Sequence, residues 1–122
     1  MGYKDGKPAL YARTREEWRN WLNQNSQTTK SVWLILYHKK SNIPSITLEE
    51  ATEEALCFGW IDSLAKKRDE QSYYLTFTPR NPKSKWSKTN IKRAERMIKE
   101  NKMTEQGQRL VDIAKMAGLW SK

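Results

Sequence analysis

Residues 77–90 read FTPRNPKSKWSKTN and mark the point at which the pattern of the chain changes. Pro79 and Pro82 exclude a regular helix or a central strand here, because proline lacks the amide hydrogen that both structures use. The segment follows a strand-like run at residues 73–77 and precedes a helical pattern that begins near Thr89. We therefore predict a functional loop that is held by rigid elements on both sides.

Basic and aromatic residues are interleaved in this loop. Its cations are Arg80, Lys83, Lys85 and Lys88. Trp86 stands among them. The whole chain has a net charge of +9, and residues 66–99 hold eleven Lys or Arg residues against three Asp or Glu residues. A solvated basic face and a surface for phosphate or another anion both explain this excess, and the sequence leaves both open.

Two capping boxes place the starts of the first two helices. Thr14 is followed three residues later by Glu17, and Thr47 by Glu50, so that a hydroxyl and a carboxylate can satisfy the first free amides. Gly59 suits the left-handed residue that ends the second helix. We expect the glutamates of that helix to lie mostly on its solvated face. They are Glu49, Glu50, Glu53 and Glu54.

The strands are predicted from apolar and alternating runs. Residues 31–38, SVWLILYH, are rich in β-branched and aromatic side chains and indicate a buried strand. Residues 60–77 indicate a β-hairpin around a polar turn, although they lack an Asn-Gly pair. Two more helices are expected, one from Ser87 or Thr89 and one from Thr104. Residues 1–13 are expected to be irregular or strand-like.

The predicted order of elements is α-β-α-β-β-α-α, which indicates an α+β fold. We predict a single domain over residues 1–122, with a small antiparallel or mixed sheet of about three to four strands packed with three to four helices. The longest apolar run, residues 32–37, is too short to span a membrane, so no membrane insertion is expected. The single cysteine, Cys57, indicates a reducing compartment, and we predict a cytoplasmic location.

The predicted hairpin brings residues 59–63 close to residues 77–80 at one end of the sheet. An arginine with several hydroxyls and helix N-terminal amides is suited to bind a carboxylate or a phosphate. The candidate ligand-binding residues are Trp60, Asp62, Ser63, Arg80, Ser84, Trp86, Ser87 and Asn90. The candidate nucleic-acid-binding residues are Lys83, Lys85, Lys88 and Lys92. The alternative is that Asp62 pairs with Arg80 and that the serines cap turns.

No established catalytic or cofactor motif is present in the sequence. It contains no Gly-rich phosphate loop, no HExxH and no CxxC. His38 is the only histidine and has no cysteine or carboxylate close to it in the sequence, so we predict neither a metal site nor a cofactor. The oligomeric state does not follow from the sequence.

Two motifs resemble the YdeI/OmpD-associated family of bacteria, whose members are also described as bacteriocin-protection proteins. They are EALCFGWIDS at residues 54–63 and FTPRNPKSKWSKTN at residues 77–90, followed by KMTEQG at residues 102–107. The resemblance covers roughly residues 10–120 and implies a cytoplasmic protein linked to resistance against bacteriocins or cationic antimicrobial peptides. Many members continue into a helical segment rich in Lys and Arg, whereas this chain stops at Lys122, so the resemblance implies a short or a truncated member.

Two mechanisms are consistent with these residues. In the first, a groove between residues 55–63 and 77–90 binds an anionic small molecule or a nucleic acid, with Trp60 and Trp86 stacking on it. In the second, a small-molecule enzyme uses Asp62 as acid/base and Arg80 as an anion clamp. Direct capture of cationic peptides is disfavoured by the net charge of +9 unless the acidic residues 49–54 provide it. We favour the binding module.

Overall fold

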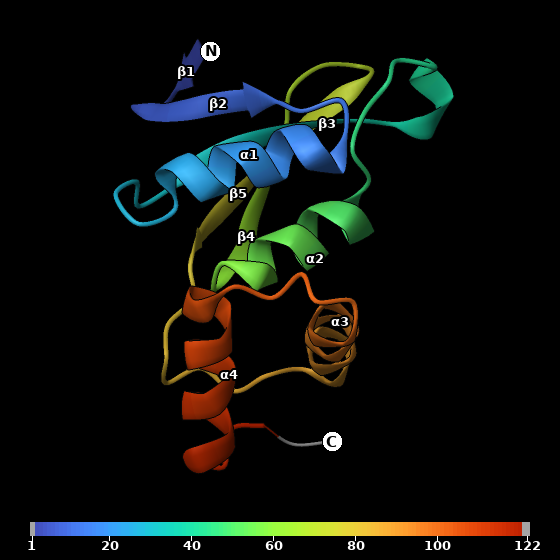
Figure 1. The fold of residues 1–122 in the computed structure, drawn as a ribbon. Coiled ribbons are helices and arrows are strands. Elements are labelled where there is room, and N and C mark those ends of the chain that lie inside the picture. The colour runs from blue at the N-terminus through green and yellow to red at the C-terminus, as the bar shows by residue number, and fades with distance from the viewer. Residues whose placement is uncertain (1, 121–122) are drawn as a thin grey trace.

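The computed structural model describes residues 2–120 and has a five-stranded sheet and four α-helices (Figure 1). The strands are β1 (Gly2–Lys4), β2 (Lys7–Tyr11), β3 (Val32–Tyr37), β4 (Trp60–Lys67) and β5 (Ser72–Pro79). The helices are α1 (Arg15–Asn25), α2 (Leu48–Cys57), α3 (Lys88–Lys99) and α4 (Glu105–Met116), with a 3-10 turn, η1, at Lys39–Ser41. The α+β class and the predicted number of helices are confirmed.

The sheet is mixed, with the strand order β1-β2-β3-β5-β4. β2 and β3 run parallel, and the other neighbouring pairs run antiparallel. The prediction of three to four strands is wrong, because residues 2–11 form a hairpin that extends the sheet to five strands. The hairpin turns at Asp5 and Gly6, whose φ angles are 52° and 78°. Asp-Gly is a residue pair that such a turn favours, so the sequence did carry the signal.

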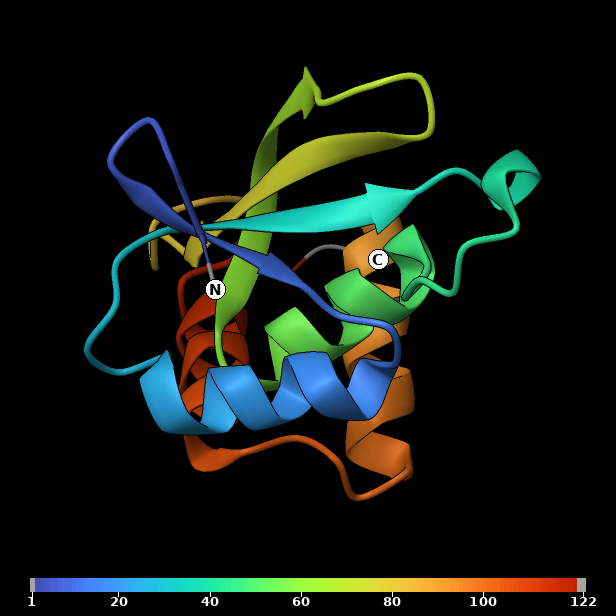
Figure 2. The same cartoon turned by 90° about the horizontal axis from the view of Figure 1, so that it is seen from above.

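All four α-helices lie on one side of the sheet (Figure 2). α1 and α2 pack on the sheet, and α3 and α4 pack beneath α2 (Figure 1). The main core joins α1, α2 and the sheet through large side chains that include Trp18, Trp60 and Phe77. A second core joins α2 to α3 and α4, with Leu56 and Val111 among its members. The helices therefore form two layers, and α2 is the element that connects them.

The predicted helix starts are confirmed. Thr47 and Glu50 form the complete capping box of α2. Thr14 caps α1, and Ser87 rather than Thr89 caps α3. Each cap satisfies an amide that the first turn of the helix leaves without a partner, and this fixes where the helix begins.

α2 has no solvated face along most of its length. Residues 51–57 are all buried, and only 3% of Glu53 and 1% of Glu54 is exposed. α1 packs against α2 from above in the view of Figure 1, and α3 and α4 pack against it from below. The expectation that these two carboxylates face water is therefore wrong. Arginines from α1 and α3 satisfy them instead.

Candidate functional site

The loop between β5 and α3 is folded around Trp86. The indole is 3% exposed and belongs to the second core. The guanidinium carbon of Arg80 lies 4.1 Å from the centre of the Trp86 ring. The Nη2 of Arg80 donates to the carbonyl of Lys85 at 3.0 Å, and the Arg80 amide donates to the carbonyl of Gly59 at 2.8 Å. The aromatic residue and the first cation of the loop thus stabilise its own conformation.

Arg80 is a buried cation that forms no ion pair within residues 2–120. Only 9% of Arg80 is exposed, and its Nε makes no hydrogen bond to the part of the chain that the structure describes. Burial lowers the pKa of its guanidinium. Asp62 does not approach it as a salt-bridge partner, so the predicted Asp62–Arg80 pair is not formed. Asp62 lies on β4 near Arg93, whose pKa is raised chiefly by hydrogen bonding to Glu49, with a further contribution from the charge of Asp62.

Trp60, the other indole of the predicted groove, lies in the main core. Its Nε1 donates to the carbonyl of Ser26 at 3.1 Å, and its ring meets Trp21 edge-on with the centres 6.0 Å apart. The structure does bring the two predicted segments together, because Trp60 pairs with Pro79 where β4 meets β5. However, Trp60 and Trp86 are both buried, so neither presents a ring face on which a ligand could stack.

The remaining candidate residues cap local structure or face solvent. The Oγ of Ser87 accepts from the amide of Asn90 at 3.1 Å, and the Oδ1 of Asn90 accepts from Arg93 at 2.8 Å. The amide of Ser84 donates to the carbonyl of Asn81 in a turn. The exposed candidates are Ser63, Lys83, Ser84, Lys85, Ser87, Lys88 and Lys92. The lysines among them are therefore the charged candidates that a ligand can reach.

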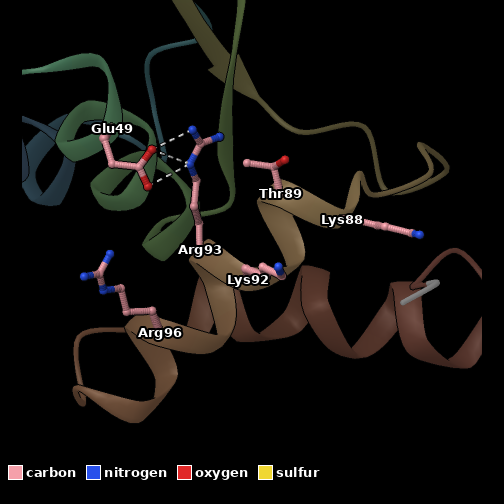
Figure 3. Close-up of a pocket in the computed structure, with 6 residues that line it drawn as sticks. All are labelled: Glu49, Lys88, Thr89, Lys92, Arg93 and Arg96. Atoms are coloured by element: carbon pink, nitrogen blue, oxygen red, sulfur yellow. Dashed lines mark hydrogen bonds and ion pairs between the residues drawn. The ribbon is translucent and has the colours of Figure 1, made fainter.

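A cleft of 350 Å³ opens between the N-terminal parts of α2 and α3 (Figure 3). Its lining residues are Glu49, Lys88, Thr89, Lys92, Arg93 and Arg96. We call it the basic cleft. Lys88, Lys92 and Arg96 follow one another at four-residue spacing, which places them along one side of α3. Four cations and one carboxylate therefore meet in one depression.

Glu49 is the carboxylate of the basic cleft. Both of its oxygens accept from the Nε of Arg93 at 3.1 Å, and its Oε1 also accepts from Nη2 at 2.7 Å. These hydrogen bonds lower the pKa of Glu49 and raise that of Arg93. Lys88 and Lys92 form no ion pair within residues 2–120, so their charges are available to a ligand.

A second set of charges, which we call the buried ionic layer, joins α1, α2 and α3. Glu54 accepts from the Nε of Arg15 at 2.7 Å and from the Nη1 of Arg19 at 2.8 Å. Glu53 accepts from Arg15 at 2.9 Å and from Arg96 at 3.0 Å. This layer was not predicted from the sequence, although the four-residue spacing of Arg15 and Arg19 beside the apolar stripe of α1 is a signal for it. Each of its two buried carboxylates pairs with two arginines, so the layer joins the three helices.

The fold defines a small α+β domain in which helices cover one side of a mixed sheet. The chain belongs to the family described as a domain of unknown function (DUF8412), whose model matches residues 10–110. Comparisons with curated proteins and with solved structures find no match. Within residues 2–120, no helix is both long and apolar enough to cross a membrane, and no cluster of His, Cys, Asp or Glu could hold a metal ion. The resemblance to the YdeI/OmpD-associated family stays a prediction.

Proposed function

We propose that this domain binds an anionic ligand, a small molecule or a nucleic acid, at the basic cleft of α3. The observation that carries the proposal is that Lys88 and Lys92 line this cleft and form no ion pair within residues 2–120. The amides in the first turn of α3 add positive potential at the same end of the helix. A phosphate or carboxylate group placed there is stabilised by the lysines and by the helix together.

The ligand thus lies on the surface of α3 rather than between two indoles. Lys83 and Lys85 are exposed on the loop that leads into α3 and add positive charge to that segment. Arg80 supports this loop through Trp86. No observation favours the small-molecule enzyme, because Arg80 is buried and does not pair with Asp62.

We also propose that the role in bacteriocin protection that the resemblance implies acts through this anionic ligand, inside the cytoplasm. Direct capture of a cationic peptide would need an acidic surface. Residues 49–54 do not offer a free one, because Glu53 and Glu54 are buried against arginines and Glu49 is bound by Arg93. The carboxylate of Glu50 is engaged in the capping box of α2. The net charge of +9 also repels a cationic peptide.

Fluorescence anisotropy of a labelled single DNA strand of about 12 nucleotides tests the proposal, with pyrophosphate titrated by calorimetry as the small anion. The variant is Lys88→Glu/Lys92→Glu. We expect it to bind DNA at least about tenfold more weakly than wild type, because two cations at the phosphate contacts become anions. The affinity of the variant should also depend less steeply on salt concentration.

The matched control is Lys30→Glu/Arg109→Glu, which makes the same change in net charge at two exposed residues outside the basic cleft. It should bind within about threefold of wild type at physiological salt, because distant charges are screened. An equal loss of affinity in the two double variants would mean that net charge alone drives binding. That result would overturn the assignment to the basic cleft.

A further inference from the structure

Three clefts meet at His38, where β3 leads into η1. Their volumes are 490, 580 and 440 Å³. The first borders the start of α2, and the other two border the turn between β4 and β5. His38 lines all three and Tyr73 lines two, so these two rings stand at the centre of one branched depression.

His38 and Tyr73 form a pair that we call the aromatic platform. Their ring centres lie 5.4 Å apart and their planes are inclined by 26°, which is a stacked arrangement. Tyr73 is half-buried and packs against the main core, which fixes its position, while His38 is exposed. The apolar side chains of Leu36 and Ile43 line the adjoining cleft. A planar aromatic group can therefore continue this stack on the outer side.

The depression around the aromatic platform attracts anions. The lysines that line it are Lys39, Lys40, Lys66 and Lys67. Its two acids are already engaged, since Asp69 pairs with Arg68 at 3.1 Å and Glu70 pairs with Lys67 at 3.3 Å. Lys66 pairs with Asp5 at 3.2 Å. Lys39 and Lys40 form no ion pair within residues 2–120, so positive charge is in excess beside the rings.

The cleft beside the aromatic platform and the basic cleft both border the first turn of α2. Thr47 and Leu48 line the cleft beside Tyr73, and the next residue, Glu49, lines the basic cleft. One extended ligand can therefore contact both sites.

We propose that the ligand is a single-stranded nucleic acid, whose phosphates contact the lysines of α3 while one of its bases stacks on His38. This inference rests on the proposed function and names its ligand class. Sites for single strands combine a cationic surface with aromatic side chains on which bases stack. In a duplex the bases are already stacked on one another and paired, so only the phosphates remain for the protein. A small anion without an aromatic ring could not stack on the aromatic platform.

The experiment compares a single DNA strand of about 12 nucleotides, RNA of the same sequence and the DNA duplex, each by fluorescence anisotropy. In His38→Ala we expect both single strands to bind about tenfold more weakly than to wild type, because one base loses its stacking partner. Duplex binding should stay within about twofold, since duplex DNA uses only the phosphate contacts. The backbone hydrogen bonds of His38, to Gln71 at 2.8 Å and from Ser41 at 3.0 Å, do not depend on its side chain, so the variant should fold.

Tyr3→Ala is the matched control, because Tyr3 is 78% exposed and lies on β1 outside these clefts. It should leave binding of single strands and duplex unchanged. A strand of abasic sites with the same phosphates gives a second measurement, and wild type should bind it about as weakly as His38→Ala binds the normal strand.

Unchanged single-strand binding in His38→Ala would overturn the stacking inference, and so would an equal loss for single strands and duplex. Neither result would contradict anion binding at the basic cleft. The proposed function fails separately, if the Lys88→Glu/Lys92→Glu variant binds all nucleic acids as wild type does.

Discussion

The two ends of α2 meet basic side chains in opposite ways. In the buried ionic layer, Glu54 is 1% exposed and binds two arginines that reach it from α1. At the other end, the side chain of Glu49 is 51% exposed and binds Arg93, while Lys88 and Lys92 stand beside it without an ion pair in residues 2–120. The number of charges in a segment therefore does not tell which cations a ligand can use. The burial and position of the acids decide this.

Arg96 connects the two regions. Its Nη1 donates to the buried Glu53 at 3.0 Å, and its side chain also lines the basic cleft. The buried ionic layer thus fixes one wall of the cleft. Variants of α2 should consequently separate into those that change stability and those that change the charge of the cleft.

The largest expected effect comes from Glu54→Gln. The change removes the ion pair of Arg19 and leaves Arg15 with Glu53 alone, although both arginines can still reach some water because their side chains are 26% and 31% exposed. We expect a loss of about 3 kcal/mol in the free energy of unfolding, because removing one partner of a buried pair leaves the other uncompensated. Urea denaturation followed by tryptophan fluorescence measures it.

Glu16→Gln is the control for this variant, because Glu16 is an exposed acid in the first turn of α1, the helix that carries Arg15 and Arg19. Its loss should stay below about 0.5 kcal/mol. A similarly small loss for Glu54→Gln would show that the buried ionic layer contributes little, and the contrast between the two ends of α2 would disappear.

The reactivity of the Cys57 thiol tests how well the region of the buried ionic layer is closed to solvent. Burial raises the pKa of its thiol from 9.0 to about 11, with the hydrogen bond from Arg19 acting against this and the charge of Glu54 adding to it. Only the thiolate reacts, so a rise of this size lowers the reactive fraction about 100-fold near pH 8. We expect the native protein to react with Ellman's reagent at least about 100-fold more slowly than the protein in denaturing urea. Fast reaction in the native state would mean that this region opens readily.

The fold was predictable from the sequence where local chemistry determines it. The caps at Thr14 and Thr47 and the buried strand at residues 31–38 use signals that lie within a few residues of one another. The fifth strand was missed although Asp5-Gly6 is a hairpin signal, because only three residues precede the pair in β1. The parallel pairing of β2 with β3 depends on the connection through α1, and no local sequence pattern predicts it.

The candidate site was less predictable, because it depends on which side chains the helices bury. Trp86 looks like a ligand platform in the sequence, yet α3 and α4 enclose it. Glu53 and Glu54 look like a solvated face, yet α2 is covered on both sides. Lys88 and Lys92 were predicted as part of a basic surface from their charge, and the structure adds that they share a cleft with Glu49.

Glu49→Gln tests the role of the acid at the end of α2 that lines the basic cleft. The substitution removes the carboxylate of the basic cleft and frees Arg93 for a ligand. We expect the single DNA strand to bind about threefold more tightly, because one repulsive charge is lost and one cation is released. Glu105→Gln changes the net charge equally on α4, outside the cleft, and should leave the affinity nearly unchanged. Weaker binding by Glu49→Gln would show that Glu49 positions Arg93 rather than competes for it.

The smallest expected effect is the pH dependence of the stability that the Glu49–Arg93 ion pair contributes. Hydrogen bonding to Arg93 lowers the pKa of Glu49 in the folded protein. A lowered carboxyl pKa contributes stability that is fully present above the unfolded value and is lost as the pH falls through the folded value. The difference in unfolding free energy between wild type and Glu49→Gln should thus be about 0.5 kcal/mol at pH 7, since the pair is half exposed, and should shrink below about pH 4. Urea denaturation of both proteins at pH 7, 5 and 3 checks this, with Glu105→Gln expected to show no such pair-specific change. A difference that grows as the pH falls would have the wrong sign for a carboxylate stabilised by Arg93, and the pair would then not be the contact that orders this end of the cleft.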